Sequence, residues 1–440
     1  MPVRLSTREP GFAAAFARLI EAKREAAADV DAAVAAILAD VAARGDAALF
    51  DYTRRFDGFD PAQSGLRLGR RDIADGAARA PAETVAALRL AAERIESFHR
   101  RQLPEPIDYI DPLGVRLATR WRPVAAAGLY VPGGTAAYPS SVLMNAIPAK
   151  VAGVERLVMT VPAPGGRLNP LVLAAAELAG IDEIYRVGGA QAIAALAYGT
   201  ATIAAVDKIV GPGNAYVAAA KRQVFGRVGI DMIAGPSEIL VVADRANDPA
   251  WIAADLLSQA EHDGAAQAVL IADDEPFAGA VERAVEDRLA HLPRVAIARA
   301  SWQAHGAVII VGDWCETPAL IDRIAPEHLE LALDAAETLA GDVQHAGAIF
   351  LGRWTPEAIG DYIAGPNHVL PTSRSARYSS PLGVYDFQKR TSVIAVSPQG
   401  ARTLGAIAAT MARGEGLPAH AASAEYRIGA ESPVAKEDAP

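Results

Sequence analysis

The sequence has little of three features that would place a protein in a specialised class. It contains a single cysteine, Cys315, which excludes an intramolecular disulfide bond and fits a reducing compartment. Its 42 lysines and arginines are outnumbered by 52 aspartates and glutamates, and the net charge of −10 argues against a general nucleic-acid binder, which needs a basic surface. No apolar run reaches the roughly 18 residues of a membrane span. No signal-peptide pattern is visible either, so we expect a cytoplasmic protein that binds neither nucleic acid nor membrane.

What is present is a globular composition, with 51% hydrophobic and 21% charged residues over 440 positions. This length allows two or three domains. The first hundred residues predict helices: Val30, Val34, Ile37 and Val41 share one helical face, and a similar stripe runs from residue 85 to 95. These stripes indicate a packing scaffold.

From about residue 156, short apolar strands alternate with helices. The predicted strands span residues 157–161, 184–187, 208–210, 239–243, 269–272, 308–311 and 348–351. Asn169-Pro170 and Asp248-Pro249 each place an N-cap residue before a proline and so predict helix starts. This alternation predicts parallel sheets covered on both faces, and the number of units indicates two α/β domains. After about residue 381 the alternation stops, and the last eleven residues are expected to form a frayed tail.

Four of the eight histidines lie in polar clusters that packing does not explain: His262, His328, His368 and His420. Gln259 and His262 are three residues apart on a predicted helix, so they share a face and offer an oxygen and a nitrogen to a metal. Spacing alone, however, favours an ordinary surface pair. Glu327-His328 follows Pro326, which predicts a loop entering a helix. That pair suits acid–base chemistry, although a structural role is equally compatible.

The remaining polar clusters follow the last predicted strand. Asp361 and His368 lie in glycine-containing loops, and ligands usually bind in loops at the carboxyl ends of parallel strands. Glu415 and His420 lie in a turn rich in glycine and proline. A set made of two nitrogens and two oxygens is one that zinc accepts, and its lack of cysteine argues against a purely structural zinc site. The candidate ligands are Gln259, His262, Asp361 and His420, whose spacing does not establish that they converge.

A nucleotide site is indicated only indirectly. No Gly-x-Gly-x-x-Gly fingerprint follows a strand. Glycine turns at 133–134, 188–189 and 211–213 precede helices, where a phosphate could approach a helix N-terminus. Each is equally consistent with a tight turn that needs positive φ.

Six blocks of sequence resemble the histidinol dehydrogenase family. They span residues 128–141, 210–214, 229–238, 258–262, 325–330 and 365–371. They occur in order within a resemblance that runs from about residue 25 to about residue 427, and they are too long for chance to explain. The departures are Pro381 and the acidic tail, and neither falls on an expected site position.

The resemblance implies a fold of two Rossmann-like α/β domains with parallel sheets, plus small N- and C-terminal helical segments. The implied helical segment covers residues 1–25. A first domain, on the substrate and metal side, would comprise 26–129 and 238–381, and a second domain, on the NAD side, would comprise 130–237. Residues 382–440 would cross over to the other subunit of a homodimer.

The resemblance also implies the chemistry: NAD-dependent oxidation of L-histidinol to L-histidine in two hydride transfers through L-histidinaldehyde, the last steps of histidine biosynthesis. One zinc ion per subunit would be held by the four candidate ligands and would anchor the substrate. His328 would take the alcohol proton, and Glu327 would activate water. The implied substrate contacts are Ser237, Gln259, His262, His328, Asp361, His368, Glu415 and His420. The implied NAD contacts are Tyr130, Gln191 and Asn214.

Three other readings remain open from the sequence. A paralogue on the same fold could oxidise another small polar alcohol. A zinc hydrolase could use Glu327 and His328 without NAD, but it would leave the glycine turns unexplained. A non-catalytic binding protein is a third class, which the four histidine clusters argue against.

Overall fold

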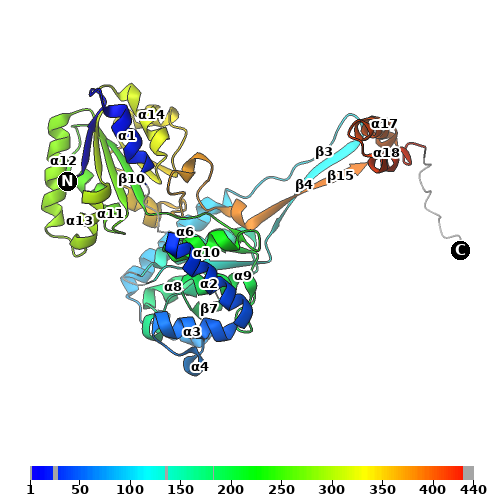
Figure 1. The fold of residues 1–440 in the computed structure, drawn as a ribbon, viewed down its shortest axis with the longest axis horizontal. Helices are drawn as coiled ribbons and strands as arrows, with labels where there is room; N and C mark the ends of the chain where they lie inside the picture. The colour runs from blue at the N-terminus through cyan, green and yellow to red at the C-terminus, as the bar shows by residue number, and fades with distance from the viewer. Residues whose placement is uncertain (1, 23–27, 134–136, 182, 430–440) are drawn as a thin grey trace. The chain divides into compact units, whose positions relative to one another are not determined.

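The computed structural model describes residues 2–22, 28–133, 137–181 and 183–429. The chain forms two compact units, one of Met1–Gln102 with Val124–Phe387 and the other of Leu103–Pro123 with Gln388–Pro440. The first unit contains two six-stranded sheets, and the second contains a three-stranded sheet (Figure 1). Among the helices of the described residues, none combines the length and apolarity needed to cross a membrane. The predicted frayed tail lies outside the described residues.

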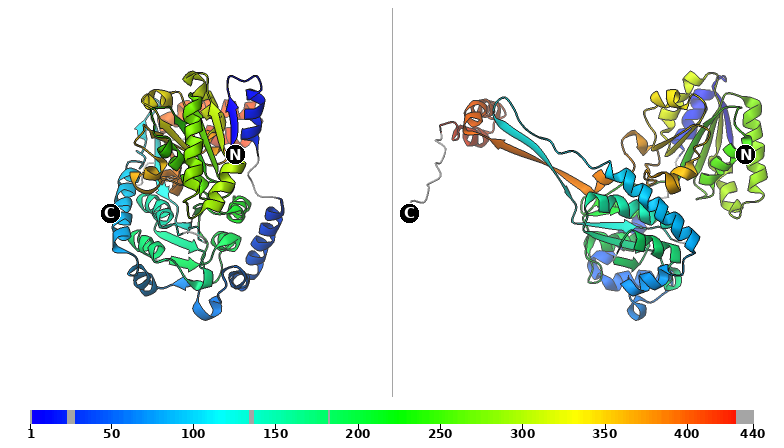
Figure 2. Two further views of the ribbon diagram at one scale, coloured as in Figure 1. Left: turned by 90° about the vertical axis from the view of Figure 1, so that its left-hand side faces the viewer. Right: turned by 180° about the vertical axis from the view of Figure 1, so that it is seen from behind.

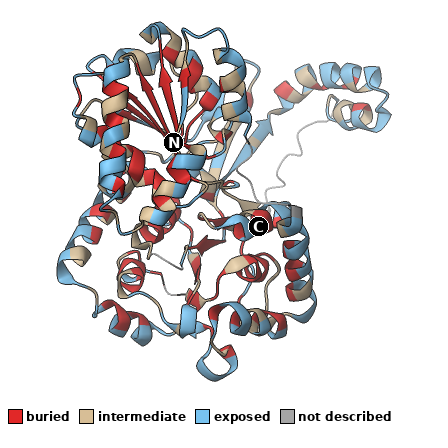
Figure 3. Cartoon of the chain, turned by 60° about the vertical axis from the view of Figure 1, so that its left-hand side comes forward, coloured by how far each residue is buried: buried red, intermediate tan, exposed pale blue. Residues whose placement is uncertain are grey.

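The first sheet is wholly parallel, with the order β1-β12-β11-β10-β13-β14. Its strands are β1 (Val3–Ser6), β12 (Ala307–Ile310), β11 (Gln267–Ala272), β10 (Glu238–Ala243), β13 (His328–Ala332) and β14 (Ala348–Leu351). Successive residues point to opposite faces, so Ile239 and Val241 pack into one core layer while Leu240 and Val242 pack into the other. Figure 3 shows the central strands of this sheet as buried, whereas the edge strands β1 and β14 are partly exposed. Burial on both faces explains why the central strands are apolar runs in the sequence.

Helices cover both faces of this sheet (Figure 2). One layer contains α11 (Pro249–Ala260), α12 (Glu275–Leu289) and α13 (Val295–His305), and the other contains α1 (Phe12–Glu21), α14 (Thr317–Ile324) and α15 (Ala336–Gly341). The predicted helix start at Asp248-Pro249 is confirmed, because the Asp248 side chain accepts a hydrogen bond from the Ala250 N–H.

The second sheet has the order β2-β7-β6-β5-β8-β9, and all its pairs are parallel except β2 with β7. Its strands are β2 (Arg67–Leu68), β7 (Glu183–Arg186), β6 (Arg156–Val161), β5 (Ala126–Tyr130), β8 (Lys208–Val210) and β9 (Gly229–Ile230). One face packs on α5 (Arg70–Ala77), α6 (Ala82–Arg100), α7 (Pro139–Ala152) and α8 (Pro170–Leu178). The other packs on α2 (Ala28–Arg44), α3 (Asp46–Asp57), α9 (Gly189–Tyr198) and α10 (Ala215–Val224).

The predicted division of the chain is wrong for residues 26–129. The helices of this region cover the second sheet, and β5 is a central strand of that sheet. The predicted stripe itself is confirmed, because Val34, Ile37 and Val41 are buried. The error arose because an apolar stripe shows that a helix is buried but not which sheet buries it.

Two further predictions of local structure are corrected. The N-terminal segment is not only helical, because β1 forms an edge strand of the first sheet before α1 begins. Residues after Pro326 do not enter a helix, because His328–Ala332 is a buried strand between β10 and β14. The buried charge of Glu330 in the middle of β13 conceals the strand pattern in the sequence.

The second unit contains an antiparallel sheet with the order β15-β4-β3, and two helices. Its elements are β3 (Asp108–Ile110), β4 (Val115–Pro123), β15 (Gln388–Val396), α17 (Pro398–Gly414) and α18 (Pro418–Glu425). Figure 2 shows β4 and β15 as a long ribbon, with the two helices beyond the end of β15. The predicted C-terminal segment therefore includes residues 103–123, while residues 382–387 belong to the first unit.

Candidate functional site

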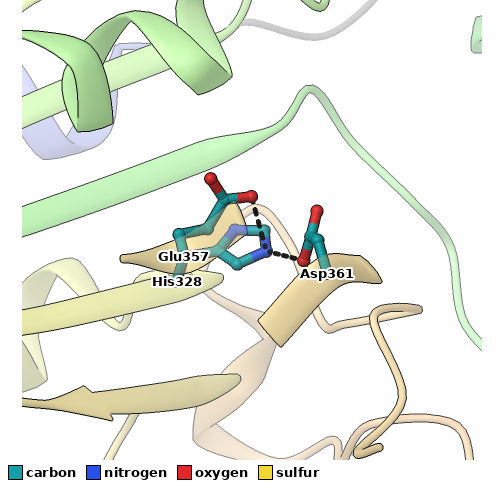
Figure 4. Close-up of side chains that lie close together, drawn as sticks. All are labelled: His328, Glu357 and Asp361. Carbon is teal, nitrogen blue, oxygen red and sulfur yellow. Dashed lines mark hydrogen bonds and ion pairs between the residues drawn. The ribbon is translucent and has the colours of Figure 1, made fainter. Parts of the chain in front are cut away.

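His328, the first residue of β13, is the best-connected side chain of the candidate site. Its Nδ1 donates to the carbonyl oxygen of Glu238 in the adjacent β10, at 2.9 Å. Its Nε2 lies 3.2 Å from Oδ1 of Asp361 (Figure 4). Because a carbonyl can only accept, the proton on Nδ1 is fixed and Nε2 is the nitrogen that faces the site.

Glu327 precedes His328 and is also buried. Its Oε2 accepts the backbone N–H of Glu238 at 2.9 Å and lies 3.6 Å from Nδ1 of His328. Burial raises the pKa of Glu327 to about 8, although the neighbouring imidazolium opposes the shift. Burial alone would lower the pKa of His328, but the charges of Glu327, Asp361 and Glu357 outweigh it and raise that pKa to about 10. Such mutually shifted groups are typical of a site that moves protons.

Asp361 reaches His328 through a short helix, α16 (Glu357–Ile359), and the π-helical turn η3 (Gly360–Ala364). A Cβ on Gly360 would lie 2.2 Å from Cε1 of Phe350, so glycine is required for this turn to pack against β14. Burial opposes ionisation of Asp361, yet the hydrogen bond from His328 holds the pKa of Asp361 well below its usual range. Asp361 is therefore an anionic group beside the imidazole.

The end of α11 brings two more predicted residues to this site. Gln259 is buried, and its Nε2 donates to Oε1 of Glu357 at 2.5 Å. His262 follows the helix, where burial lowers its pKa and the charge of Asp361 opposes the shift. A helix C-terminus carries partial negative charge, so this end of α11 also favours a cation.

The site lies at the amino edge of the first sheet, not at the carboxyl edge that the sequence predicted. β10 and β13 are the strands where the topology changes direction, and Glu238 and His328 are their first residues. Helix α11 runs back from the carboxyl edge to the amino edge. Helix α16 lies beside β13, where the Glu357 N–H hydrogen-bonds to the Glu330 carboxyl. Returning segments therefore carry Gln259 and Asp361 to the opposite edge.

His368 and Ser237 adjoin the same group. His368 donates from Nδ1 to the carbonyl oxygen of Asp361 at 2.8 Å, and its Nε2 lies 3.4 Å from Oγ of Ser141 at the start of α7. Ser237 immediately precedes Glu238, and its carbonyl accepts the Gln267 N–H at 2.9 Å. Helix α7 belongs to the second sheet, so residues that pack on both sheets meet here.

Tyr130, Gln191 and Asn214 lie at the carboxyl edge of the second sheet. The topology changes direction between β5 and β8, the position where open α/β sheets bind ligands. Tyr130 ends β5, and its hydroxyl accepts the Gly189 N–H at 3.1 Å, next to Gln191. Burial raises the pKa of Tyr130 to about 12. Asn214 follows β8 and caps α10, its Oδ1 accepting from two backbone N–H groups.

The glycines at this edge are explained by the packing of the chain itself. A Cβ on Gly188 would lie 2.3 Å from Pro162, and one on Gly211, at φ +110°, would lie 2.1 Å from the Tyr130 carbonyl oxygen. The Gly211 loop is held by a buried ion pair: Lys221 donates to the Gly211 carbonyl at 2.9 Å, and Asp231 accepts the Gly211 N–H at 2.7 Å. The glycines alone therefore do not indicate a phosphate site.

Glu415 and His420 lie in the second unit, where both are exposed. Their convergence with the other predicted residues stays a prediction.

The donor set fits a metal ion. Within the described residues, His328, Glu357 and Asp361 offer ligand atoms that all lie within 4.8 Å of one another. Asp361 belongs to the predicted ligand set, and Gln259 is bonded to Glu357. The sequence reasoning missed Glu357, although its position four residues before Asp361 was a usable signal on a helical segment.

A sequence model described as histidinol dehydrogenase matches residues 20–428. The chain belongs to the histidinol dehydrogenase family. The histidinol dehydrogenase of Rhodospirillum rubrum is 65% identical over 429 residues, covering 97% of this chain and 99% of that protein. That of Ruegeria pomeroyi is 61% identical over 428 residues, covering 97% and 99%.

The fold agrees with this assignment. A crystal structure of histidinol dehydrogenase from Elizabethkingia anophelis matches with a TM-score of 0.92 at 36% identity, covering 97% of this chain and 98% of that chain. The family name places this chain among the oxidoreductases and confirms the resemblance predicted from the six sequence blocks.

Proposed function

We propose that this chain catalyses the NAD-linked, zinc-dependent oxidation of L-histidinol to L-histidine through L-histidinaldehyde, the last steps of histidine biosynthesis. The observation that carries the proposal is the buried His328, held by the Glu238 carbonyl and Asp361 with Glu327 beside it. Family membership supplies the substrate.

In this mechanism Nδ1–H of His328 stays on the Glu238 carbonyl, and Nε2 is the nitrogen that exchanges protons. Because the raised pKa keeps Nε2 protonated near neutral pH, Nε2 must release its proton before it can take the proton of the alcohol. Glu327 then takes a proton from the water that attacks the aldehyde, and its raised pKa makes the carboxylate a stronger base. The bond from the Glu238 N–H fixes one Glu327 oxygen, and we assign the proton transfer from water to the other.

Gln259, His262, Asp361 and His420 would hold the zinc ion. When bound, zinc supplies an anchor for the imidazole and amino nitrogens of the substrate, and bound NAD accepts the hydride. Ser237, His368 and Glu415 would contact the substrate. Tyr130, Gln191 and Asn214 would contact NAD, which makes the second sheet the NAD side and the first sheet the substrate and metal side.

The main test is NADH formation, followed by ultraviolet absorbance with L-histidinol before and after zinc chelation. We expect about two NADH per histidinol, because two hydrides leave each substrate molecule, and loss of turnover on chelation. Folded, zinc-loaded protein that forms no NADH would contradict this substrate and favour the paralogue that oxidises another small polar alcohol.

A homodimer with shared sites is part of the proposal. The second unit exposes many large apolar side chains, which are typical of a surface that a partner chain covers. They are Ile107, Tyr109, Ile110, Leu113, Ile394, Val396, Ile407, Met411, Leu417 and Tyr426. Glu415 and His420 of this unit would then complete the active site of the partner subunit.

Subunit mixing tests the shared site. A His420→Ala protein should lose zinc, and a His328→Ala protein should lose its base. Mixed heterodimers should regain activity, because one of their two sites has both residues. Mass spectrometry verifies that the subunits have exchanged. If exchange is verified and no activity returns, a site built from two chains is ruled out.

A further inference from the structure

Glu357 contacts two consecutive residues at the end of α11. Its carboxyl group is 97% buried, at 3% side-chain exposure. Oε1 accepts from Nε2 of Gln259 at 2.5 Å, and Oε2 accepts from Oγ of Ser258 at 2.7 Å. Both oxygens thus contact the last turn of this helix, just before His262, and the carboxyl group also hydrogen-bonds to that of Asp361.

The bond to Gln259 selects the orientation of its side-chain amide. An amide has one donating end and one accepting end. The nitrogen of Gln259 is the end that lies on Oε1 of Glu357, which leaves the carbonyl oxygen as the end available to a ligand. Zinc binds the oxygen of an amide and not its protonated nitrogen.

Glu357 does not contact the imidazole as Asp361 does. Its Oε1 lies 3.9 Å from Nε2 of His328, beyond hydrogen-bond distance, whereas Asp361 lies at 3.2 Å. Figure 4 shows the two carboxyl groups on either side of the ring nitrogen. Asp361 therefore faces His328 directly, whereas the Glu357 carboxyl is hydrogen-bonded to Gln259 and Ser258.

Glu357 is itself held in place by its surroundings. Helix α16 is a single short turn and cannot fix a side chain by its own stability. The backbone N–H of Glu357 faces the carboxyl group of Glu330 in β13, and Glu330 is hydrogen-bonded to Asp255 of α11. Contacts between α16, β13 and α11 thereby fix the carboxyl that holds Gln259.

We propose that Glu357 is a positioning residue of the metal centre, which holds the Gln259 amide so that its carbonyl oxygen faces the ion. It acts through Gln259 and is not a metal ligand. This inference rests on the proposed function, because it assumes that the wild-type protein binds zinc through Gln259.

The test is a double-mutant cycle on zinc affinity, measured by competition of the purified, zinc-stripped protein with a chromophoric chelator. Glu357→Ala should weaken zinc binding by about 10- to 100-fold, the usual effect of losing an outer-shell partner. Glu357→Gln should retain most of the affinity, because its amide oxygen can still accept from Gln259. Ser258→Ala removes the second bond to Glu357 together with the local bond from Ser258 to the Asp255 carbonyl, but it keeps the bond to Gln259, so it should have a smaller effect than Glu357→Ala.

The decisive comparison is made in a Gln259→Ala background. If Glu357 acts through Gln259, Glu357→Ala should cause little further loss there. An equal loss in both backgrounds, or no loss in either, would overturn the proposal, and the first of these would make Glu357 a direct ligand. Circular dichroism of the zinc-free variants checks folding, and Glu357→Met, which fills a similar volume, replaces an alanine variant that does not fold.

The wild-type titration separates this inference from the proposed function. A wild-type protein that binds no zinc would overturn both. A wild-type protein that binds zinc with unchanged affinity after Gln259→Ala would overturn only the role given to the Gln259–Glu357 contact.

Discussion

The amino edge of the first sheet and the carboxyl edge of the second sheet are formed by different types of residue. At the first edge, buried ionisable side chains lie against one another, and they include Glu327, His328 and Asp361. At the second edge, the chain turns on glycine and proline, and Tyr130 and the Lys221–Asp231 pair hold the backbone.

Buried charges are costly unless they are paired and hydrogen-bonded. At the first edge this cost appears as large pKa shifts in opposite directions, which suits groups that exchange protons. At the second edge the charges of Lys221 and Asp231 fix the Gly211 loop. They have no part in the proton transfers that we propose. Substitutions should therefore affect turnover at the first edge and stability at the second.

The largest expected effect is on turnover. His328→Ala should lower kcat by about 100- to 10,000-fold, the usual contribution of a general base, while the protein stays folded. Steady-state NADH formation and circular dichroism measure the two quantities. Rates like those of the wild type would show that His328 is not the base.

At the second edge, Lys221→Ala should destabilise the fold by about 3–5 kcal/mol, because it leaves Asp231 buried without its charged partner. Chemical denaturation measures the free energy of unfolding. Lys150→Ala is the matched control, since Lys150 is exposed and donates only to the Gly180 carbonyl. Equal effects of the two substitutions would mean that the buried pair has no special role.

The smallest expected effect depends on pH and concerns Glu330, behind the first edge. Burial and the neighbouring Asp255 raise the pKa of Glu330 to about 9. The folded state thus holds a proton that the unfolded state releases above about pH 4.5, so stability falls as pH rises toward 9. Glu330→Gln cannot ionise and should be more stable than the wild type at pH 9 by on the order of 1 kcal/mol. Denaturation curves of both proteins at pH 6 and pH 9 measure their free energies of unfolding. A difference between the two free energies that is no larger at pH 9 than at pH 6 would contradict this prediction.

Local features of the fold could be predicted from the sequence. The strands around residues 157–161, 208–210 and 239–243 were found because burial on both faces makes them apolar runs. The caps at Asn169 and Asp248 were found because capping chemistry is local. Tertiary features were missed: no local pattern shows that β1 pairs with β12, or that the helices between residues 28 and 102 pack on the second sheet.

The candidate site was predictable as a set of residue types but not as a geometry. His328 and Asp361 were named from their polar surroundings, and the structure brings them together. These residues meet at the amino edge because α11 and α16 return to that edge after their strands. Sequence spacing does not show the direction in which such segments run. Glu357 was missed because a lone glutamate near a turn resembles a surface residue until its burial is known.

Strand β1 also has a consequence for the order in which the protein is made. Val3 pairs with Ala307, so β1 leaves the ribosome about 300 residues before the strand that it pairs with. All strands of the second sheet lie between Arg67 and Ile230, so that sheet can form earlier in synthesis. The expected order is therefore the second sheet first and the first sheet last, with His328 reaching its final environment only late in translation.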